Sequence, residues 1–290
     1  MTTSIARMNL VLHGVEDFRI ARGDTLDAPH FTQQDRLATF DVVLANPPYS
    51  IKRWNRDAWQ SDVWGRNTLG TPPQGRADYA FFQHILASLD ARTGRCVILF
   101  PHGVLFRQEE RDMRRKLIES DQLDCMLGLG PNLFFNSPME ACVVICRTSK
   151  PPERQGRVLF IDAVNEIARE RAYSFLKLEH QQRIADAYHR FADQPGFCHV
   201  AEQDSIATNG HSLSIPLYVK RHEHNAEAGN SEDRRTLREV WDDWKGEGRV
   251  FWQQMDALVD TLDGLIADQP DSNAKSHSSM RRARCPTTET

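Results

Sequence analysis

Apolar residues along this chain fall into two patterns, short continuous runs and longer stretches in which they recur every three or four positions. Short runs bounded by polar residues predict strands buried in a sheet. They occur at Phe40–Leu44, Gly94–Pro101, Leu123–Leu129, Ala141–Arg147 and Val158–Ala163. The recurring pattern predicts helices, at Ile5–Val15, Asp78–Leu89, Glu109–Ser120 and Leu176–Phe191.

Alternating strands and helices predict an α/β fold on a parallel sheet, which ends here in a strand pair joined by a short loop. Ligands bind such sheets beyond the carboxyl ends of the strands. Two short motifs hold that position. The sequence GDTL (residues 23–26) follows a predicted short strand at Phe18–Ile20. The sequence NPPY (residues 46–49) follows the strand Phe40–Leu44, which we expect to be buried on both faces.

The pattern changes in the last part of the chain. Residues 221–267 form a predicted helical extension. Its two helices fall between Glu232 and Ile266, are split at residues 246–248, and carry an apolar stripe suited to packing on this protein or on another subunit. Residues 268–290 are polar and predict a disordered tail.

Composition limits the class of protein. The chain is 40% apolar and 26% charged, as in ordinary globular proteins, and its apolar runs are far too short to span a bilayer. It shows no secretory signal and no Cys-x-x-Cys pair. We therefore expect a cytoplasmic protein with free thiols, no membrane contact and no metal site.

The charge distribution bears on nucleic-acid binding. Residues 221–290 hold 10 basic and 14 acidic side chains, while residues 1–220 hold 26 of each. A protein that grips DNA alone through its phosphates usually carries a basic surplus. This chain therefore either does not bind nucleic acid tightly or relies on a partner to do so.

The NPPY turn is stiff and poor in hydrogen-bond donors. Its prolines fix the backbone so that the Asn46 side chain and proline carbonyls point out of the turn. An amide oxygen and a carbonyl oxygen can hold both hydrogens of a planar NH2 group, which directs the nitrogen lone pair at an electrophile. Tyr49 offers a face on which a planar ring can stack. The plainer alternative is a rigid loop after a strand.

The segment DVVLANPPY (residues 41–49) resembles the catalytic motif of amino methyltransferases that use S-adenosylmethionine. The tetrad alone also fits enzymes that methylate glutamine in release factors or guanine in ribosomal RNA. The flanking segments resemble the modification subunit of type I restriction–modification systems, a family of N6-adenine DNA methyltransferases. They are MNLVLHG from Met8, IARGDTL from Ile20, ADYAFFQH from Ala77, GRCVILFPHGVLFR from Gly94, NLFF from Asn132, VLFIDA from Val158 and LSIPLYV from Leu213.

The resemblance implies a Rossmann-like methyltransferase sheet and, as substrate, an adenine flipped out of the DNA duplex. Carried over residue by residue, Asn46 and Pro47 would bind the adenine amine. Tyr49 would stack on the flipped ring, and Pro48 would shape the turn.

The resemblance also implies S-adenosylmethionine as cofactor. Asp24 would accept a hydrogen bond from the amino group of the cofactor's adenine, with Thr25 and Leu26 beside it. Phe81 and Asp78, which lies at the start of the same helix, would help wall the pocket of the target base. As alternatives, Asp24 is a loop or helix-cap aspartate, and Phe81 belongs to the core.

Three tryptophans lie on the polar loop after NPPY, at Trp54, Trp59 and Trp64. They fit either contact with DNA or the flipped base, or packing of the loop itself. The histidines are dispersed without metal-site spacing, which indicates structural or solvated roles.

This sequence lacks segments that the family has in front of its third strand. These are a helical domain, a strand ending in a glycine-rich loop for the methionine part of the cofactor, and a strand with a carboxylate for the ribose. We therefore expect the front strands of the sheet to be missing and a strand edge to be unpaired. Affinity for S-adenosylmethionine should be poor, and we expect an N-terminally truncated subunit that is inactive alone.

The resemblance divides the chain into a partial methyltransferase domain (residues 1–165), the family's C-terminal segment (166–220), a helical extension (221–267) and a tail (268–290). It implies a complex with DNA, one specificity subunit, a second modification subunit and, in some systems, a restriction subunit. Two other functions stay open. One is an N-methyltransferase that acts on protein glutamine or RNA, and the other is a non-catalytic remnant that binds a specificity subunit.

Overall fold

The computed structural model describes residues 2–134, 139–170 and 173–220. All of them belong to the first of the chain's two units, Met1–His224, and the second unit is Asn225–Thr290. The predicted extension at 221–267 and the predicted tail at 268–290 lie outside the described residues.

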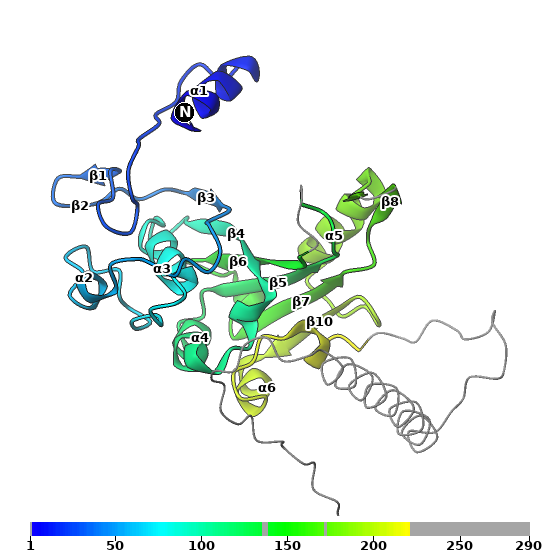
Figure 1. The fold of residues 1–290 in the computed structure, drawn as a ribbon. Coiled ribbons are helices and arrows are strands. Elements are labelled where there is room, and N and C mark those ends of the chain that lie inside the picture. The colour runs from blue at the N-terminus through cyan, green and yellow to red at the C-terminus, as the bar shows by residue number, and fades with distance from the viewer. Residues whose placement is uncertain (1, 135–138, 171–172, 221–290) are drawn as a thin grey trace, which may run out of the picture. The chain divides into compact units, whose positions relative to one another are not determined.

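A six-stranded sheet forms the centre of the described unit, in the order β10-β7-β5-β6-β4-β3 (Figure 1). Its strands are β3 (Val42–Ala45), β4 (Arg95–Pro101), β5 (Leu123–Leu129), β6 (Ala141–Arg147), β7 (Arg157–Ala163) and β10 (Cys198–Glu202). The pairs β3–β4 and β5–β7 are parallel, and the other three pairs are antiparallel. The α/β fold is therefore confirmed, on a mixed sheet rather than a parallel one.

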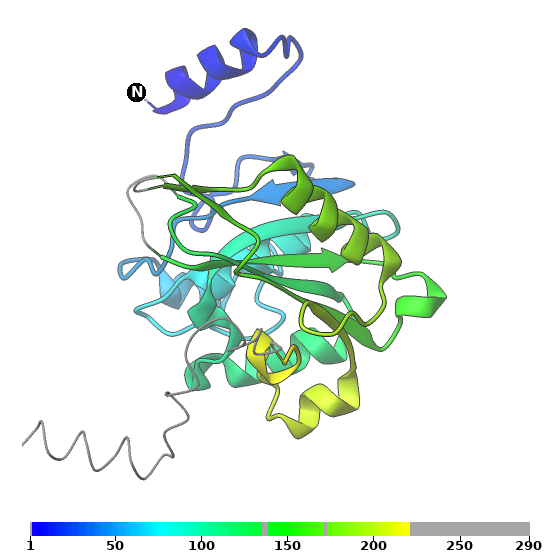
Figure 2. The same cartoon turned by 90° about the vertical axis from the view of Figure 1, so that its right-hand side faces the viewer.

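Helices cover the two faces of the sheet unequally. The helices are α1 (Thr2–Leu12), α2 (Arg56–Gln60), α3 (Asp78–Ala87), α4 (Arg111–Glu119), α5 (Leu178–Arg190) and α6 (Gln203–Thr208). Apolar side chains of α3, α4 and α6 share one core with inward residues of β4, β6 and β7. Figure 2 shows α5 on the opposite face, where it packs on β7.

Short elements connect these layers. Two small antiparallel strand pairs lie outside the central sheet in the described residues, β1 (Thr32–Gln33) with β2 (Arg36–Leu37) and β8 (Ala168–Glu170) with β9 (Tyr173–Phe175). The 3-10 turns are η1 (His102–Leu105), η2 (Gln108–Glu110), η3 (Pro152–Arg154) and η4 (Ile215–Leu217). No helix in the described ranges is long and apolar enough to cross a membrane.

The edge strand β3 differs from its prediction. We expected Phe40–Leu44 to be buried on both faces, but Val42 is 46% exposed and Leu44 is 75% exposed. Val43 and Ala45 point the other way and pack against the core that contains α3. The prediction was wrong because, among the described elements, a helix layer covers β3 on one face only and no strand pairs with its outer edge.

The strand predicted at Phe18–Ile20 was also wrong. These residues have no regular structure, because a strand forms only where a neighbour accepts and donates its backbone hydrogen bonds. The helix predicted at Ile5–Val15 is confirmed as α1, although Ile5 and Met8 are 61% and 64% exposed.

Candidate functional site

The NPPY loop follows the carboxyl end of β3 directly, as predicted. The Asn46 side chain is exposed and has no hydrogen-bond partner among the described residues, whereas Pro47 is buried and Pro48 is exposed. Tyr49 is half-buried. Burial raises the pKa of the Tyr49 hydroxyl, and the charges of Cys142 and Asp78 add to the effect. The loop thus presents a free amide close to a half-buried aromatic side chain.

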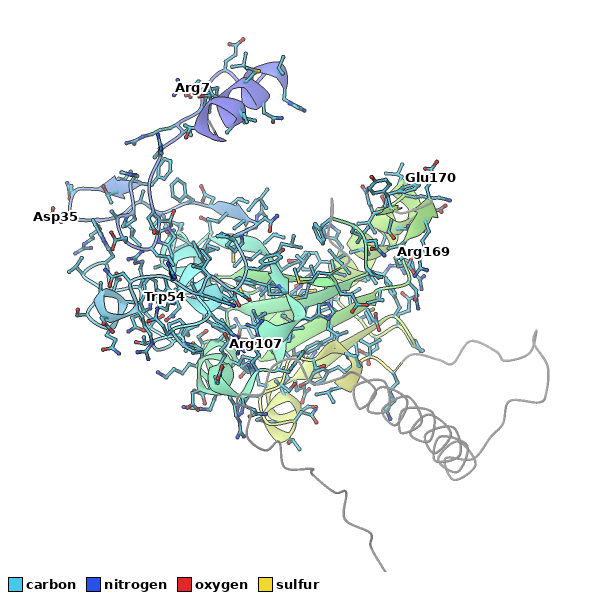
Figure 3. The ribbon with its side chains drawn as sticks, viewed as in Figure 1. Arg7, Asp35, Trp54, Arg107, Arg169 and Glu170 are labelled. Carbon is cyan, nitrogen blue, oxygen red and sulfur yellow. The ribbon has the colours of Figure 1, made fainter. Side chains whose placement is uncertain are left out.

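The residue after the tetrad is anchored to the start of α3. Ser50 has a left-handed backbone (φ 50°), and its N–H donates to Asp78 Oδ1 at 2.8 Å. Arg107, labelled in Figure 3, donates from Nη1 to Asp78 Oδ2, also at 2.8 Å. Asp78 is only 1% exposed. Its observed contacts therefore hold the loop, and its predicted place in the wall of a base pocket stays a prediction.

The tryptophan-bearing loop packs between the two motifs. Leu26 of GDTL, Trp59, Ala77 and Ala80 form a small buried cluster, against which Phe81 and Trp54 lie half-buried. Trp59 is 2% exposed, and Trp54 meets it edge to face with ring centroids 6.1 Å apart. Packing is thus the observed role of Trp59. Phe81 faces this cluster, and its predicted contact with the target base stays a prediction.

The GDTL turn leaves one carboxylate oxygen available. Asp24 Oδ1 accepts from the N–H of Leu26 at 2.9 Å and of Asp27 at 3.4 Å. Asp24 and Thr25 are exposed, whereas Leu26 is buried. No residue in the described part of the chain binds Asp24 Oδ2. Asp24 is therefore a turn-forming aspartate, as one alternative held, with a second oxygen that can accept from a ligand.

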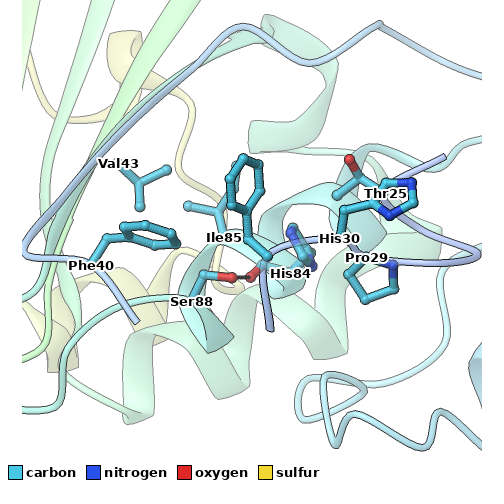
Figure 4. A pocket seen from close by; sticks show the side chains of 9 residues that line it. Thr25, Pro29, His30, Phe40, Val43, His84, Ile85 and Ser88 are labelled. Atoms are coloured by element: carbon cyan, nitrogen blue, oxygen red, sulfur yellow. Dashed lines mark hydrogen bonds between the residues drawn. The ribbon is translucent and has the colours of Figure 1, made fainter. Parts of the chain in front are cut away.

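A cavity of about 130 Å³ lies between this turn, β3 and α3 (Figure 4). Thr25, His30, Val43 and His84 are among its lining residues. Its volume is below the roughly 300–1,000 Å³ of typical ligand pockets, so this cavity alone does not enclose a nucleoside. Burial, followed by the charge of Arg66, lowers the pKa of His84 to about 4, so this imidazole is neutral at pH 7.

Arg66 ties the GDTL turn to the loop after NPPY. Its guanidinium donates to the carbonyl oxygens of Thr25 and Leu26 and pairs with Asp62. Arg66 and Asp62 could not be predicted from the sequence, since single charged residues in a polar loop carry no pattern that distinguishes them from solvated ones. Arg107 was missed because it begins a run of mixed charges, RQEERDMRRK, which is typical of a solvated helix face.

The cysteines in the described segments are buried. Five of the six cysteines lie in described segments, and all five are buried free thiols. In the same segments, no group of three or more His, Cys, Asp or Glu side chains is arranged to hold a metal ion.

Comparison with known proteins places the chain in a family. A profile described as N-6 DNA Methylase matches residues 1–227. The chain belongs to the N-6 DNA methylase family.

Individual N-6 DNA methylases support this assignment. The chain is 28% identical over 283 residues to the type I restriction enzyme MjaVIII methylase subunit of Methanocaldococcus jannaschii, across 92% of the chain and 47% of that subunit. It is 30% identical over 274 residues to the MjaVII methylase subunit of the same organism, across 90% and 45%. The chain thus spans about half the length of the relatives it matches.

A solved structure gives the same result. The type I restriction–modification methyltransferase subunit from Streptococcus thermophilus aligns with a TM-score of 0.69 and 34% identity, over 75% of this chain and 46% of that one. The resemblance drawn from the sequence is therefore confirmed for the family and the fold. The role of each site residue stays a prediction.

Proposed function

We propose that this chain carries the catalytic loop of an adenine N6-methyltransferase that acts on DNA. One observation supports the proposal above the others. The Asn46 side chain is exposed and free of partners among the described residues, at the carboxyl end of β3, on a loop that Asp78 anchors through Ser50. A free acceptor on a fixed backbone is what positional catalysis on an amine requires.

The chemistry follows from these groups. The Asn46 amide oxygen and the Pro47 carbonyl oxygen accept the two hydrogens of the adenine 6-amino group, and Tyr49 stacks on the flipped ring. Holding both hydrogens turns the nitrogen lone pair out of conjugation and toward the methyl donor. The amine would form a bond to the methyl carbon as the bond between that carbon and the donor sulfur breaks, which would leave a neutral thioether, and the amine would release one proton to water.

The expected cofactor is S-adenosylmethionine, which supplies a methyl group bonded to a positively charged sulfur. Asp24 fits the adenine end of this cofactor because its Oδ2 remains a free acceptor within the described structure while Oδ1 shapes the turn. Thr25 and Leu26 would lie beside it. Phe81 would contribute to the pocket for the target base.

We also propose that the chain works within an assembly. Residues 1–220 carry equal numbers of acidic and basic side chains, so DNA binding would rest on a specificity subunit, with a second modification subunit completing the enzyme. The relatives are themselves named as methylase subunits of type I restriction enzymes.

The test is Asn46→Ala in the reconstituted assembly, with tritiated S-adenosylmethionine and adenine-containing DNA. We expect the rate of N6-methyladenine formation to fall by about 10²–10³-fold, the usual effect of removing one positioned polar group. Asn209→Ala, at the end of α6, is the matched control and should retain full activity. Unchanged methylation by the Asn46 variant would refute the assignment of this loop.

The same assay separates the alternatives. If the tritium label enters RNA or protein glutamine and not DNA, the substrate is RNA or protein and the proposal of DNA as substrate is wrong. The exposed apolar residues of β3 favour a second candidate, a non-catalytic subunit that docks on a specificity subunit. Co-purification with that subunit, with no cofactor binding by calorimetry, would support this candidate over catalysis.

A further inference from the structure

We infer that Arg66 is a positioning residue that fixes the GDTL turn in the conformation that presents Asp24. The inference rests on the proposed role of Asp24 toward the cofactor. Arg66 lies in the loop after NPPY, 40 positions or more from the carbonyls that it binds.

Every N–H of the Arg66 guanidinium has an acceptor. Nε donates to Asp62 at 3.1 Å, and Nη2 donates to Asp62 Oδ1 at 2.6 Å and to the Leu26 carbonyl at 2.8 Å. Nη1 donates to the Thr25 carbonyl at 2.9 Å and contacts His84 Nδ1 at 3.3 Å. Arginine has five N–H donors and no acceptor, so all the donors of Arg66 are engaged at this site.

The pair is buried, which excludes a solvated surface ion pair. Arg66 and Asp62 side chains are 2% and 5% exposed, and the guanidinium lies over the Trp59 ring, 4.6 Å from its centroid. Because Arg66 can only donate, His84 Nδ1 must be the unprotonated nitrogen. A buried charge is tolerated only where it is paired and hydrogen-bonded, so the geometry around Arg66 is closely constrained.

Arg66 and Asp24 hold the same turn from opposite sides. Asp24 Oδ1 accepts from the N–H of Leu26, while Arg66 binds the carbonyls of Thr25 and Leu26. With both the N–H and the carbonyl of Leu26 engaged, the turn has little freedom, and the direction of Asp24 Oδ2 is set.

The same contacts connect the GDTL turn to the NPPY loop. Arg66 reaches His84 on α3, and Asp78 at the start of α3 binds Ser50 of the loop after NPPY. Both motifs are thus fastened to one helix. A change at Arg66 should disturb the cofactor turn while leaving the Ser50–Asp78 contact in place.

The first test measures amide hydrogen exchange in the 290-residue chain carrying Arg66→Lys. A lysine ammonium cannot reach two carbonyls and Asp62 together. We expect exchange at Leu26 and Asp27 to accelerate by at least about tenfold, with β5 and β7 unchanged. The control is Arg154→Lys, a buried arginine that binds Asp124 and should leave Leu26 and Asp27 unchanged.

A second variant guards against loss of folding. Asp62→Asn keeps an acceptor but removes the charge that balances Arg66, and it should give a smaller acceleration at the same two amides. The inference is overturned if both variants leave these amides within about twofold of wild type, or if they accelerate β5 and β7 equally.

The third test uses the assembled methyltransferase. Arg66→Lys and Asp24→Asn should each raise KM for S-adenosylmethionine by about tenfold while kcat changes little, because both act on cofactor binding. If Asp24→Asn leaves KM unchanged, the proposed role of Asp24 fails, and hydrogen exchange still decides whether Arg66 holds the turn. If Asp24→Asn raises KM and Arg66→Lys does not, the positioning role of Arg66 is refuted.

Discussion

Two buried carboxyl groups near the NPPY loop differ in how they are bound. Asp78 accepts from Ser50 and Arg107. Glu110 is fully buried, and neither of its carboxyl oxygens has a hydrogen-bond partner within the described structure. Arg107 Nη1 lies 3.6 Å from Glu110 Oε1. Burial raises the pKa of Glu110 to about 7, and the charge of Arg107 offsets only part of this increase.

This pKa predicts a pH-dependent stability. Glutamate ionises near 4.5 when unfolded and near 7 here, so the folded state binds more protons between these values. The free energy of unfolding should therefore fall as pH rises through 7, by about 3 kcal/mol from this group. Glu110→Gln, which cannot ionise, should remove that fall, as measured by urea denaturation at pH 5 and pH 8.

The control for this prediction is Glu109→Gln. Glu109 is exposed and pairs with Arg76, so its variant should keep the wild-type pH dependence. Equal pH dependence of wild type and the Glu110 variant would contradict the prediction.

At the same scale, the exposed residues of the two motifs could be predicted from the sequence. The residues that bind these motifs from elsewhere in the chain could not. Asn46 and Asp24 stand in motifs, so their positions could be predicted. Arg66 binds the carbonyls of Thr25 and Leu26 across about 40 residues of sequence, and no local pattern records such a contact. Asp78 was predicted to line the pocket of the target base, but its observed hydrogen bonds connect it to Ser50 and Arg107.

Among the strands, too, some could be predicted from the sequence and others could not. Strands β4, β5, β6 and β7 were predicted within one residue at each end, because both faces of each are largely apolar and covered. The strand β10 was missed, since its five residues CHVAE, at the edge of the sheet, hold neither a continuous apolar run nor a strict alternation of polar and apolar residues. The two-residue strands of the β1–β2 hairpin are too short to produce a period.

The exposed face of β3 gives a prediction about stability. Leu44 is 75% exposed, so Leu44→Ala in the 290-residue chain should change the free energy of unfolding by less than about 0.5 kcal/mol. Leu159→Ala, the same change at a fully buried position of β7, should cost about 2–5 kcal/mol. Urea denaturation measures both. A cost above about 2 kcal/mol at Leu44 would mean that another part of the chain covers this face in solution.

At the scale of the whole molecule, the predicted fold is confirmed, whereas the predicted domain boundaries stay predictions. The family, the α/β fold and the strand-end position of NPPY all followed from the sequence. The proposed divisions at 165/166 and 220/221 rest on the resemblance alone. One observation bears on the first: β10 pairs with β7 across it and extends the same sheet.

The last prediction concerns the activity of the 290 residues on their own. They contain no glycine-rich strand-and-loop segment, and the outer edge of β3 is unpaired among the described strands. A cofactor that needs close backbone approach would have contacts on the Asp24 side only. We therefore expect no N6-methyladenine when the chain alone is incubated with tritiated S-adenosylmethionine and DNA.

Complementation sharpens this prediction. Co-expression with the part of the Streptococcus thermophilus subunit that this chain does not match should restore methylation if that part completes the sheet beside β3. Leu44→Asp would place a charge on the surface to be covered and should abolish the restored activity, although it leaves the isolated chain folded. Label incorporated by the chain alone, or full complementation by the Leu44 variant, would show that β3 does not need a neighbour for catalysis.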